Sequence, residues 1–274
     1  MSGRLYLVGT PIGNLGDLTD RARETLRTVE IVAAEDTRRT GRLLKTIGVS
    51  RTIVSLFEGN ERERTEELLA RLREGSDVAV VTDAGMPVIS DPGFRLVRAC
   101  VDGGIEVRVV PGPSAVTAGL AVSGLPVDRF VFEGFLPRRA GPRRDRLRAL
   151  ADEPRTIVLF ESPRRLVPLL REALVELGDR RVAVGRELTK LHEEVIRGRL
   201  GEVLERLAGA EVRGEIVVVL EGRTEPGPAG TDELVAEARR LVASGLRRRA
   251  AATEVARRHG ASANAIYREL LDRG

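Results

Sequence analysis

Residues Leu5–Thr19 read LYLVGTPIGNLGDLT, a short β-rich run that ends in a turn containing Gly9, Gly13 and Gly16. Glycine lets the backbone approach a ligand closely, although the same spacing also suits a plain turn. The motif has neither the Gly-x-Gly-x-x-Gly spacing of dinucleotide enzymes nor the lysine of a phosphate-binding loop. It therefore predicts a strand followed by a tight turn, and it does not by itself indicate a ligand class.

The same succession of a β-rich run and an amphipathic helical pattern continues over the first 110 residues. This alternation predicts a mainly parallel sheet with helices on its faces. The expected strands are Leu5–Val8, Ile31–Ala34, Thr52–Leu56, Val78–Val81 and Val107–Val110, and the expected helices cover residues 19–29, 37–47, 61–74 and 91–103. Turns rich in Gly and Pro follow the first, fourth and fifth strands. Because ligands of open α/β sheets bind beyond the carboxyl ends of strands, we expect these three turns to act together.

A second α/β unit is expected after the apolar stretch Ala115–Pro126. Its expected strands are Phe130–Glu133, Ile157–Phe160, Val182–Gly185, Glu194–Gly198 and Ile216–Leu220, with helices near 142–151, 163–177 and 201–208. The segment RTEPGPAG (Arg223–Gly230) reads as a linker to about three short helices. The predicted organisation is thus an α/β fold with domains over residues 1–113 and 114–224 and a small helical tail over 231–274.

Composition excludes several classes of protein. With 42% hydrophobic and 31% charged residues, the chain fits neither a disordered protein nor a membrane bundle. Cys100 is the only cysteine and the two histidines lie far apart, so we expect neither a disulfide framework nor a metal site. The sequence has no signal peptide pattern and no apolar run long enough to span a bilayer, which predicts a cytoplasmic protein without membrane contact.

The charge is unevenly distributed along the chain. Residues 1–113 carry a net charge of −1, residues 114–228 carry +2 and residues 229–274 carry +3. Pro137–Arg148 has six arginines and one aspartate, and Ala238–Gly260 has seven arginines and one glutamate. Each cluster alone could be a solvated helix face, but basic surfaces attract phosphate, and two of them favour a polyanionic partner.

The turn after the fourth strand is the most informative part of the first half. VVTDAGMPVISDPG (Val80–Gly93) places Asp83 at the end of the strand, and Ser90 or Asp91 is expected to cap the next helix. A carboxylate beside free backbone amides suits a cofactor with amino or hydroxyl groups better than a triphosphate. The third turn, VVPGPSAVTA, opens an apolar helix at Ser114.

These segments, in this order, resemble the tetrapyrrole methylase superfamily, whose members bind S-adenosylmethionine between two α/β domains. Further segments are similar to one branch, the small-subunit (16S) ribosomal RNA (cytidine-2′-O)-methyltransferases. They are AAEDTRRT (33–40), FEGFLPR (132–138), FESPRR (160–165), RELTKLHEE (186–194) and GEIVVVLEG (214–222). The resemblance covers about residues 4–222 and extends to the tail. It implies methylation of a decoding-region cytidine, in naked RNA or in the assembled small subunit, by a homodimer.

The resemblance also implies where S-adenosylmethionine binds. The turn at Pro11 would form the floor of the cleft, and Asp83 with the backbone amides of Ala84, Gly85 and Met86 would hold the methionine portion. The remaining expected cofactor contacts are Ser114, Ala115, Phe160, Leu188 and Ile216.

Transfer to a ribose oxygen requires removal of the 2′-hydroxyl proton. The motifs offer Glu187, Lys190, His192, Glu35 and Asp36 for this step. Lys190 is preferred because it is one of two lysines among 45 basic residues, and an amine can lose a proton that a guanidinium keeps. The survival of two lysines by chance is the alternative. We therefore predict Lys190, Glu187 and Asp36 as catalytic and His192 as a structural or surface residue.

Arginines beside these motifs are candidates for binding RNA phosphates, with ion pairs to nearby carboxylates as the alternative. The predicted RNA contacts are Arg38, Arg138, Arg139, Arg143, Arg144, Arg164 and Arg165. Two other functions stay open: methylation of a tetrapyrrole or another small molecule, and non-enzymatic nucleic-acid binding. The first has no use for a basic loop and tail, and the second leaves the turns at Asp83 and Ser114 unexplained.

The tail reads as helix, turn, helix. Ala256 and Gly260 have the spacing of a tight turn, Ser262 is expected to cap the last helix, and Ile266 and Leu270 lie on its expected buried face. Such modules often bind DNA, but a short tail on a larger enzyme favours an RNA-docking or packing module.

Overall fold

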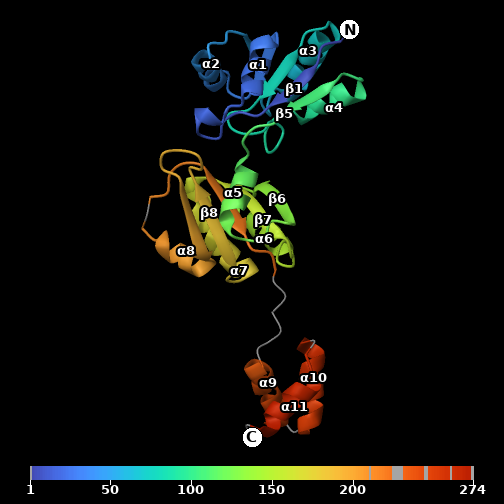
Figure 1. The fold of residues 1–274 in the computed structure, drawn as a ribbon, viewed down its shortest axis with the longest axis vertical. Coiled ribbons are helices and arrows are strands. Elements are labelled where there is room, and N and C mark those ends of the chain that lie inside the picture. Colours follow the sequence, from blue (N-terminus) through green and yellow to red (C-terminus); the bar gives the residue numbers. More distant parts are fainter. Residues whose placement is uncertain (1, 210, 224–230, 244–245, 260, 273–274) are drawn as a thin grey trace. The chain divides into compact units, whose positions relative to one another are not determined.

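The computed structural model describes residues 2–209, 211–223, 231–243, 246–259 and 261–272. The chain divides into two compact units, of which the first ends at Gly222 and the second begins at Arg223. The first unit contains two five-stranded sheets, and the second consists of helices (Figure 1).

The first sheet has the strand order β3-β2-β4-β1-β5, and all neighbouring strands in it are parallel. The strands are β1 (Leu5–Val8), β2 (Ile31–Ala34), β3 (Thr52–Ser55), β4 (Val78–Val81) and β5 (Val107–Val110). All five predicted strands are confirmed, with β3 ending one residue early. Four fully apolar residues make β4 the buried centre of the sheet, as expected of a parallel strand covered on both sides.

Helices cover both faces of this sheet. The helices α1 (Asp20–Thr28) and α2 (Thr37–Thr46) pack on one face, through residues such as Leu26 and Leu44. The helices α3 (Glu61–Arg73) and α4 (Phe94–Asp102) pack on the other, through residues such as Leu68 and Leu96. The first glycine-rich turn ends in a short 3-10 helix, η1 (Leu15–Asp17), which contains Gly16.

One predicted helix start is wrong. The helix α4 begins at Phe94 with Gly93 as its N-cap, so neither Ser90 nor Asp91 caps it. The side chain of Glu61, at the start of α3, accepts hydrogen bonds from the amide of Gly93 at 2.9 Å and from the amide two residues later at 3.0 Å. Because a neighbouring helix supplies the cap, Ser90 and Asp91 are left in the preceding loop.

The second sheet has the order β6-β7-β10-β8-β9. Its strands are β6 (Phe130–Phe135), β7 (Thr156–Glu161), β8 (Arg181–Arg186), β9 (Glu194–Arg199) and β10 (Ile216–Leu220). Only the β6–β7 pair is parallel, and the other neighbours are antiparallel. All five predicted strands are found, four of them longer than expected.

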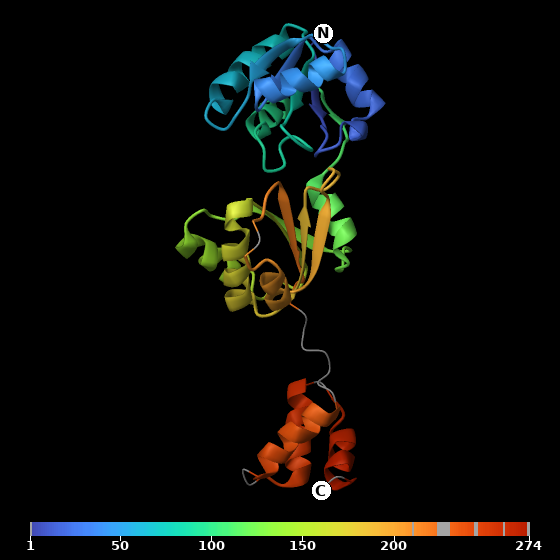
Figure 2. The same ribbon diagram turned by 90° about the vertical axis from the view of Figure 1, so that its left-hand side faces the viewer.

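Helices also lie on both sides of the second sheet (Figure 2). The helices α6 (Ala140–Ala149), α7 (Pro163–Leu177) and α8 (Leu200–Arg206) share one apolar cluster, and α5 (Ala115–Ser123) contributes to the cluster on the opposite face. The helix α5 approaches the sheet closely at Gly119, where a Cβ atom would lie 2.8 Å from Val217 Cγ1. Glycine is therefore needed at this contact.

The tail forms three helices, α9 (Thr231–Ala243), α10 (Arg248–His259) and α11 (Ala263–Asp272), with an apolar cluster of their own. Ile266 and Leu270 are buried in it, and the Ser262 hydroxyl accepts a hydrogen bond from the amide of Ala265 at 3.4 Å. The predicted cap and buried face are thus confirmed, whereas Gly260 and most of the expected linker lie outside the described residues. Across the described ranges, no helix is long and apolar enough to cross a membrane.

Candidate functional site

The turns after β1, β4 and β5 meet because these three strands are neighbours in the sheet. Thr10 and Gly85 exchange backbone hydrogen bonds of 2.9 and 3.1 Å. Gly9 lies against Gly112, so closely that a Cβ atom on Gly9 would be 2.6 Å from the nitrogen of Gly112. Glycine at both positions lets the turns come together at the carboxyl edge of the sheet, which is the expected place for a ligand.

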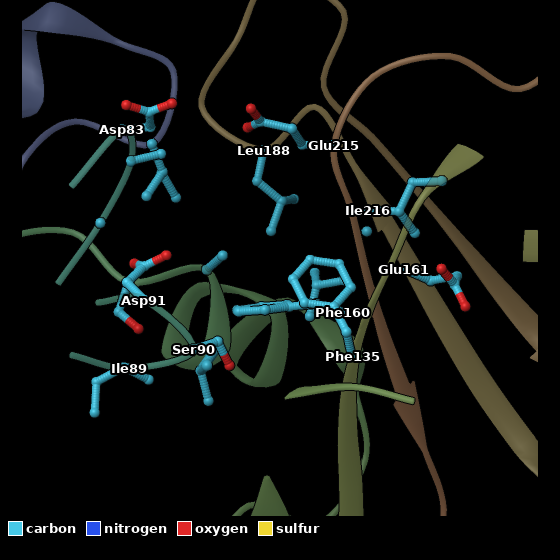
Figure 3. A pocket seen from close by; sticks show the side chains of 18 of the residues that line it. Asp83, Ile89, Ser90, Asp91, Phe135, Phe160, Glu161, Leu188, Glu215 and Ile216 are labelled. Atoms are coloured by element: carbon cyan, nitrogen blue, oxygen red, sulfur yellow. The ribbon is translucent and has the colours of Figure 1, made fainter. Parts of the chain in front are cut away.

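A cavity of about 470 Å³ lies next to these turns and is lined by residues that follow strands of both sheets (Figure 3). Its volume is within the range of about 300–1,000 Å³ that is typical of small-molecule sites. Nine of the ten residues predicted to bind the cofactor line it. They are Asp83, Ala84, Gly85, Met86, Ser114, Ala115, Phe160, Leu188 and Ile216. Pro11 instead lines a neighbouring cavity.

One wall of the cavity is apolar. Phe160 packs edge-on against Phe132, with ring centroids 5.0 Å apart, and Phe135 lies 5.6 Å from Phe160. Leu188 and Ile216 are buried beside them. Phe135 was not among the predicted site residues, because a bulge between Phe132 and Gly134 shifts the strand register. Without the bulge, residues 132 and 135 would face opposite sides of the sheet.

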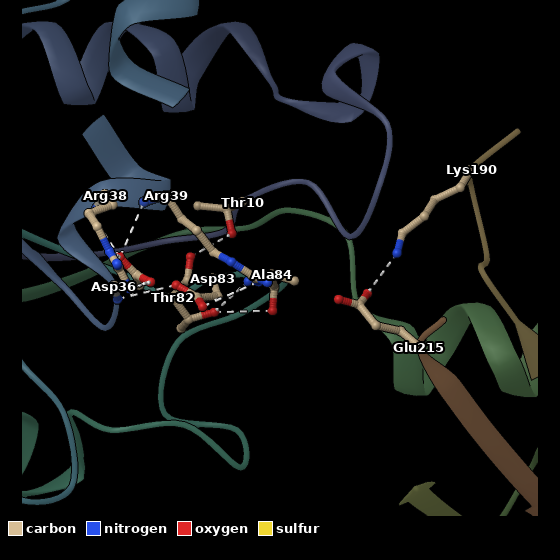
Figure 4. A network of polar contacts seen from close by, with 9 residues as sticks. All are labelled: Thr10, Asp36, Arg38, Arg39, Thr82, Asp83, Ala84, Lys190 and Glu215. Atoms are coloured by element: carbon tan, nitrogen blue, oxygen red, sulfur yellow. Dashed lines mark hydrogen bonds and ion pairs between the residues drawn. The ribbon is translucent and has the colours of Figure 1, made fainter. Parts of the chain in front are cut away.

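Three carboxylates of the first sheet's side, Glu35, Asp83 and Asp91, also line the cavity. Figure 3 shows Asp83 and Asp91 across the cavity from Ile216. Asp83 is fixed by Arg39, whose Nη1 lies 3.3 Å from its Oδ2, and it accepts a hydrogen bond from the amide of Asp36 at 3.2 Å (Figure 4). Burial raises the pKa of Glu35, and the nearby charge of Asp83 raises it further.

Asp91 is a cavity residue that the sequence analysis assigned to helix capping. Burial raises its pKa to about 7, the negative charges of Glu35 and Asp83 add to this shift, and a hydrogen bond with Thr82 opposes it. The loop that carries Asp91 has left-handed backbone at Val88 (φ 76°) and at Ser90 (φ 64°). Such conformations are costly for residues other than glycine and are concentrated at functional sites.

Lys190 does not line this cavity and is held as part of an ion-pair network. Its Nζ atom lies 2.7 Å from Glu187 Oε1. The same atom lies 3.2 Å from Glu215 Oε2 (Figure 4). Its stem packs on Gly13, where a Cβ atom would lie 2.3 Å from Lys190 Cγ. Burial lowers the pKa of Lys190, but the contacts with the two glutamates outweigh burial and raise it overall. Lys190 thus connects the turns of the two sheets as a charged ammonium group.

The other two predicted catalytic residues, Glu187 and Asp36, also form hydrogen bonds within the protein. Glu187 accepts the hydrogen bond from Lys190, which lowers the pKa of the Glu187 carboxyl. Asp36 caps α2 by accepting from the amide of Arg38 at 2.8 Å, and its contacts with Arg38 lower the pKa of Asp36. His192 is exposed, which confirms that it is a surface residue.

The predicted RNA contacts fall into two groups. Arg138, Arg139, Arg144 and Arg164 are exposed. Arg38 and Arg165 pair with Asp36 and Glu161, and Arg143 is buried against Glu172. The guanidinium of Arg143 donates to both oxygens of Glu172, at 2.6 and 2.8 Å, so it has no free face for a phosphate. Arg143 is therefore a structural residue, and the prediction of an RNA contact there needs correction.

The cavity has the features that S-adenosylmethionine requires of a site. Its apolar wall suits an aromatic base, and its carboxylates suit an amino group and a positively charged sulfur. The Glu161 side chain is fully buried at the cavity wall, and its Oε2 atom has no hydrogen-bond partner among the described residues. A buried acceptor without a partner is costly, so this oxygen is available to an N–H donor of a ligand.

Comparison with known proteins agrees with this geometry. The family model described as Tetrapyrrole (Corrin/Porphyrin) Methylases matches residues 4–204. A Thermotoga maritima protein named Ribosomal RNA small subunit methyltransferase I is 52% identical over 221 residues, which cover 81% of this chain and 99% of that protein. Proteins of the same name from Mycobacterium tuberculosis (CDC 1551) and Escherichia coli O157:H7 are 48% and 44% identical, each match covering 98% of this chain and 95% of the relative.

Solved structures give the same result for the fold. Uroporphyrin-III C-methyltransferase from Thermus thermophilus, complexed with S-adenosyl homocysteine, is 26% identical with a TM-score of 0.57, covering 80% of this chain and 97% of that one. A cobalt precorrin-4 methyltransferase is similar in fold, with a TM-score of 0.60 over 80% of this chain and 94% of that one. The chain therefore belongs to the tetrapyrrole (corrin/porphyrin) methylase family and, within it, to the group of ribosomal RNA small subunit methyltransferase I proteins.

Proposed function

We propose that the protein uses S-adenosylmethionine to methylate the ribose 2′-oxygen of a cytidine in the decoding region of small-subunit ribosomal RNA. The observation that carries this proposal is the cavity beyond the carboxyl ends of the parallel strands, which is lined by carboxylates as well as by apolar and aromatic side chains. The identity of 44–52% to relatives named as small-subunit ribosomal RNA methyltransferases supports the substrate.

Different residues of the cavity would bind the two ends of the cofactor. Asp83 and the backbone amides of residues 84–86 would hold the methionine portion, and Phe160, Leu188 and Ile216 would enclose the adenine. When bound, the cofactor supplies a methyl group on a positively charged sulfur, which is a strong electrophile. The protein then has to align the ribose oxygen and accept its proton.

Asp91 is the side chain best suited to accept that proton. It lines the cavity, no described cation pairs with it, and its pKa of about 7 leaves much of it deprotonated at neutral pH. The O–H bond of the ribose would break as the Asp91 carboxylate takes the proton. The other candidates are Lys190, Glu187 and Asp36. They would hold the turns around the cavity in place and would not exchange the proton, because each is engaged in a hydrogen-bonded ion pair.

The exposed arginines supply the surface for RNA. Arg138, Arg139, Arg144 and Arg164, with Arg38 and Arg165 beside the cavity, would contact phosphates of the RNA or of the assembled small subunit. We further propose a cytoplasmic homodimer, and light scattering, which distinguishes the mass of one chain from that of two, tests it.

Ribose methylation in cells tests the proposed substrate. Primer extension on small-subunit RNA should reveal a 2′-O-methylated cytidine that is lost when the gene is deleted and restored when it is returned. Unchanged methylation in the deletion strain would refute the substrate. Isothermal calorimetry with S-adenosylmethionine tests the cofactor independently, and an absence of binding would remove the enzymatic function.

Methylation of a tetrapyrrole is the second candidate. The similarity to uroporphyrin-III C-methyltransferase, at 26% identity, favours it. The same protein can be offered uroporphyrinogen and small ribosomal subunits with a labelled methyl donor. We expect label in the RNA, and label in the tetrapyrrole alone would reverse the order of the two candidates.

A further inference from the structure

The helix α2 is strongly basic. Between Thr37 and Thr46 it carries Arg38, Arg39, Arg42 and Lys45 and no acidic residue. Arg38 is paired with Asp36 and Arg39 with Asp83. Arg42 is exposed, and no acidic partner for it is found in the described part of the chain. It is therefore a cation on this helix that is free to meet an anion.

A second cavity, of about 340 Å³, opens beside this helix. Arg39 and Asp83 line both this cavity and the cofactor cavity, so the ion pair between them forms a shared wall. Figure 4 shows this pair beside Thr10, which also lines the second cavity. Arg42 lies at the second cavity together with Leu15, an apolar side chain that is 51% exposed. The cavity thus offers a free cation and an apolar surface next to the cofactor site.

We propose that this second cavity holds a nucleotide of the RNA strand adjacent to the methylated one, with Arg42 binding its phosphate and Leu15 contacting its base. This inference rests on the proposed function. Each ribose carries a phosphate on both sides, so a ribose presented to the cofactor cavity brings a neighbouring phosphate to its wall. Proteins that recognise RNA commonly bind unpaired bases through stacking and hydrogen bonds and hold the phosphate backbone with basic side chains.

Binding of small ribosomal subunits from a strain that lacks the methylation tests the role of Arg42. Arg42→Ala should weaken binding about tenfold, the effect of losing one hydrogen bond between charged groups. The slope of log K against log salt should become shallower by roughly 0.7. Arg42→Lys should restore most of the affinity, because it restores the charge. The affinity for S-adenosylmethionine should not change in either variant.

Arg73 provides a matched control. It is an exposed arginine at the end of α3, whose chain leads to the amino end of β4 and so to the edge of the sheet opposite the cavities. Arg73→Ala should bind subunits as the native protein does. Arg42→Ala that also binds like the native protein would overturn the proposal, and so would an equal loss in both variants.

Crosslinking locates the nucleotide directly. Cys100 is buried and its thiol pKa is raised to about 11 by burial, so a surface cysteine is selectively labelled. Leu15→Cys carrying an azidophenacyl group should crosslink to nucleotides next to the target cytidine, whereas Arg73→Cys should not. If the native protein methylates the subunits but Leu15→Cys crosslinks elsewhere or not at all, this inference fails while the proposed function stands. If the native protein does not methylate them, the proposed function fails first.

Discussion

Individual side chains at the cavity differ in how their charge is stabilised. Asp83 is paired with Arg39, and Glu187 is paired with Lys190, whose hydrogen bond lowers the pKa of the Glu187 carboxyl. Asp91 faces Glu35 and Asp83 in a partly buried position, which stabilises its protonated form. A proton acceptor that works near neutral pH needs a raised carboxyl pKa of this kind, and Asp91 provides it.

The first prediction concerns the pH dependence of methyl transfer. Only the deprotonated Asp91 accepts a proton, so the single-turnover rate at saturating cofactor should rise with pH through a midpoint near 7. Asp91→Asn should remove this limb and reduce the rate by about 10²- to 10⁴-fold. Glu35→Gln should move the midpoint to lower pH, because it removes a negative charge that raises the pKa of Asp91. An Asp91→Asn variant that keeps the native pH profile would exclude this role.

The second prediction concerns Lys190. Its scarcity in the sequence favoured an amine that loses a proton, whereas its contacts with Glu187 and Glu215 favour a permanent charge. Lys190→Arg should therefore retain most of the activity, and Lys190→Met should lose it because two carboxylates are left facing each other. Steady-state kinetics on small subunits measures both variants. Loss of turnover in Lys190→Arg with unchanged cofactor affinity would instead support the amine as a base.

At the scale of elements, ion pairs connect the helix α6 to the helix α7 and to the strand β6. The Pro137–Arg148 segment gave a basic cluster in the sequence, but its Arg143 points inward to Glu172 on α7. Arg146 likewise pairs with Glu133 on β6, and Arg148 with Glu176 on α7. Some arginines of the Pro137–Arg148 segment therefore hold α6 in place through ion pairs, and others are exposed.

The third prediction separates these two roles by measuring stability. Arg143→Ala leaves Glu172 charged and without its partner, so it should lower the free energy of unfolding by about 3 kcal/mol, near the lower end for breaking a buried pair. Arg144→Ala, on the exposed side of the same helix, should leave stability within about 0.5 kcal/mol. Urea unfolding monitored by circular dichroism measures both, and equal stability of the two variants would contradict the structural role of Arg143.

For the whole molecule, the division at Gly222 and Arg223 separates the cofactor cavity from the helical tail. The tail has its own apolar cluster, which includes Leu234, Val255 and Ile266. It carries a net charge of +3 over residues 229–274. This positive charge suits the tail for contacts with phosphates.

The fourth prediction is the effect of removing residues 229–274. Binding of small subunits should become weaker and less dependent on salt, because phosphate contacts are lost. Binding of S-adenosylmethionine, measured by calorimetry, should be unchanged. A deletion variant that loses cofactor binding would show that the tail supports the first unit, and one that binds subunits normally would remove the tail from RNA recognition.

Local signals in the sequence were sufficient to predict the helices and strands and to indicate most of the residues that line the candidate cavity. Short β-rich runs, several of them followed by turns rich in Gly and Pro, predicted all ten strands, because these residue types favour strands and turns locally. The glycine-rich turns predicted which edge of the sheet carries the cavity, and nine of the ten cofactor contacts that the family resemblance implies line that cavity. These features are encoded within short segments, so they can be read without the fold.

The tertiary structure decided what depends on partners distant in the chain. Glu61 caps α4 and thereby leaves Asp91 in the cavity, and the β6 bulge brings Phe135 to Phe160. The pairing of Arg143 with Glu172 and of Lys190 with Glu215 likewise joins residues that are 29 and 25 positions apart. Burial and charge at these sites are set by neighbours from other elements. The sequence by itself therefore determined the architecture and the cofactor, and the tertiary structure decided which charges are free to act.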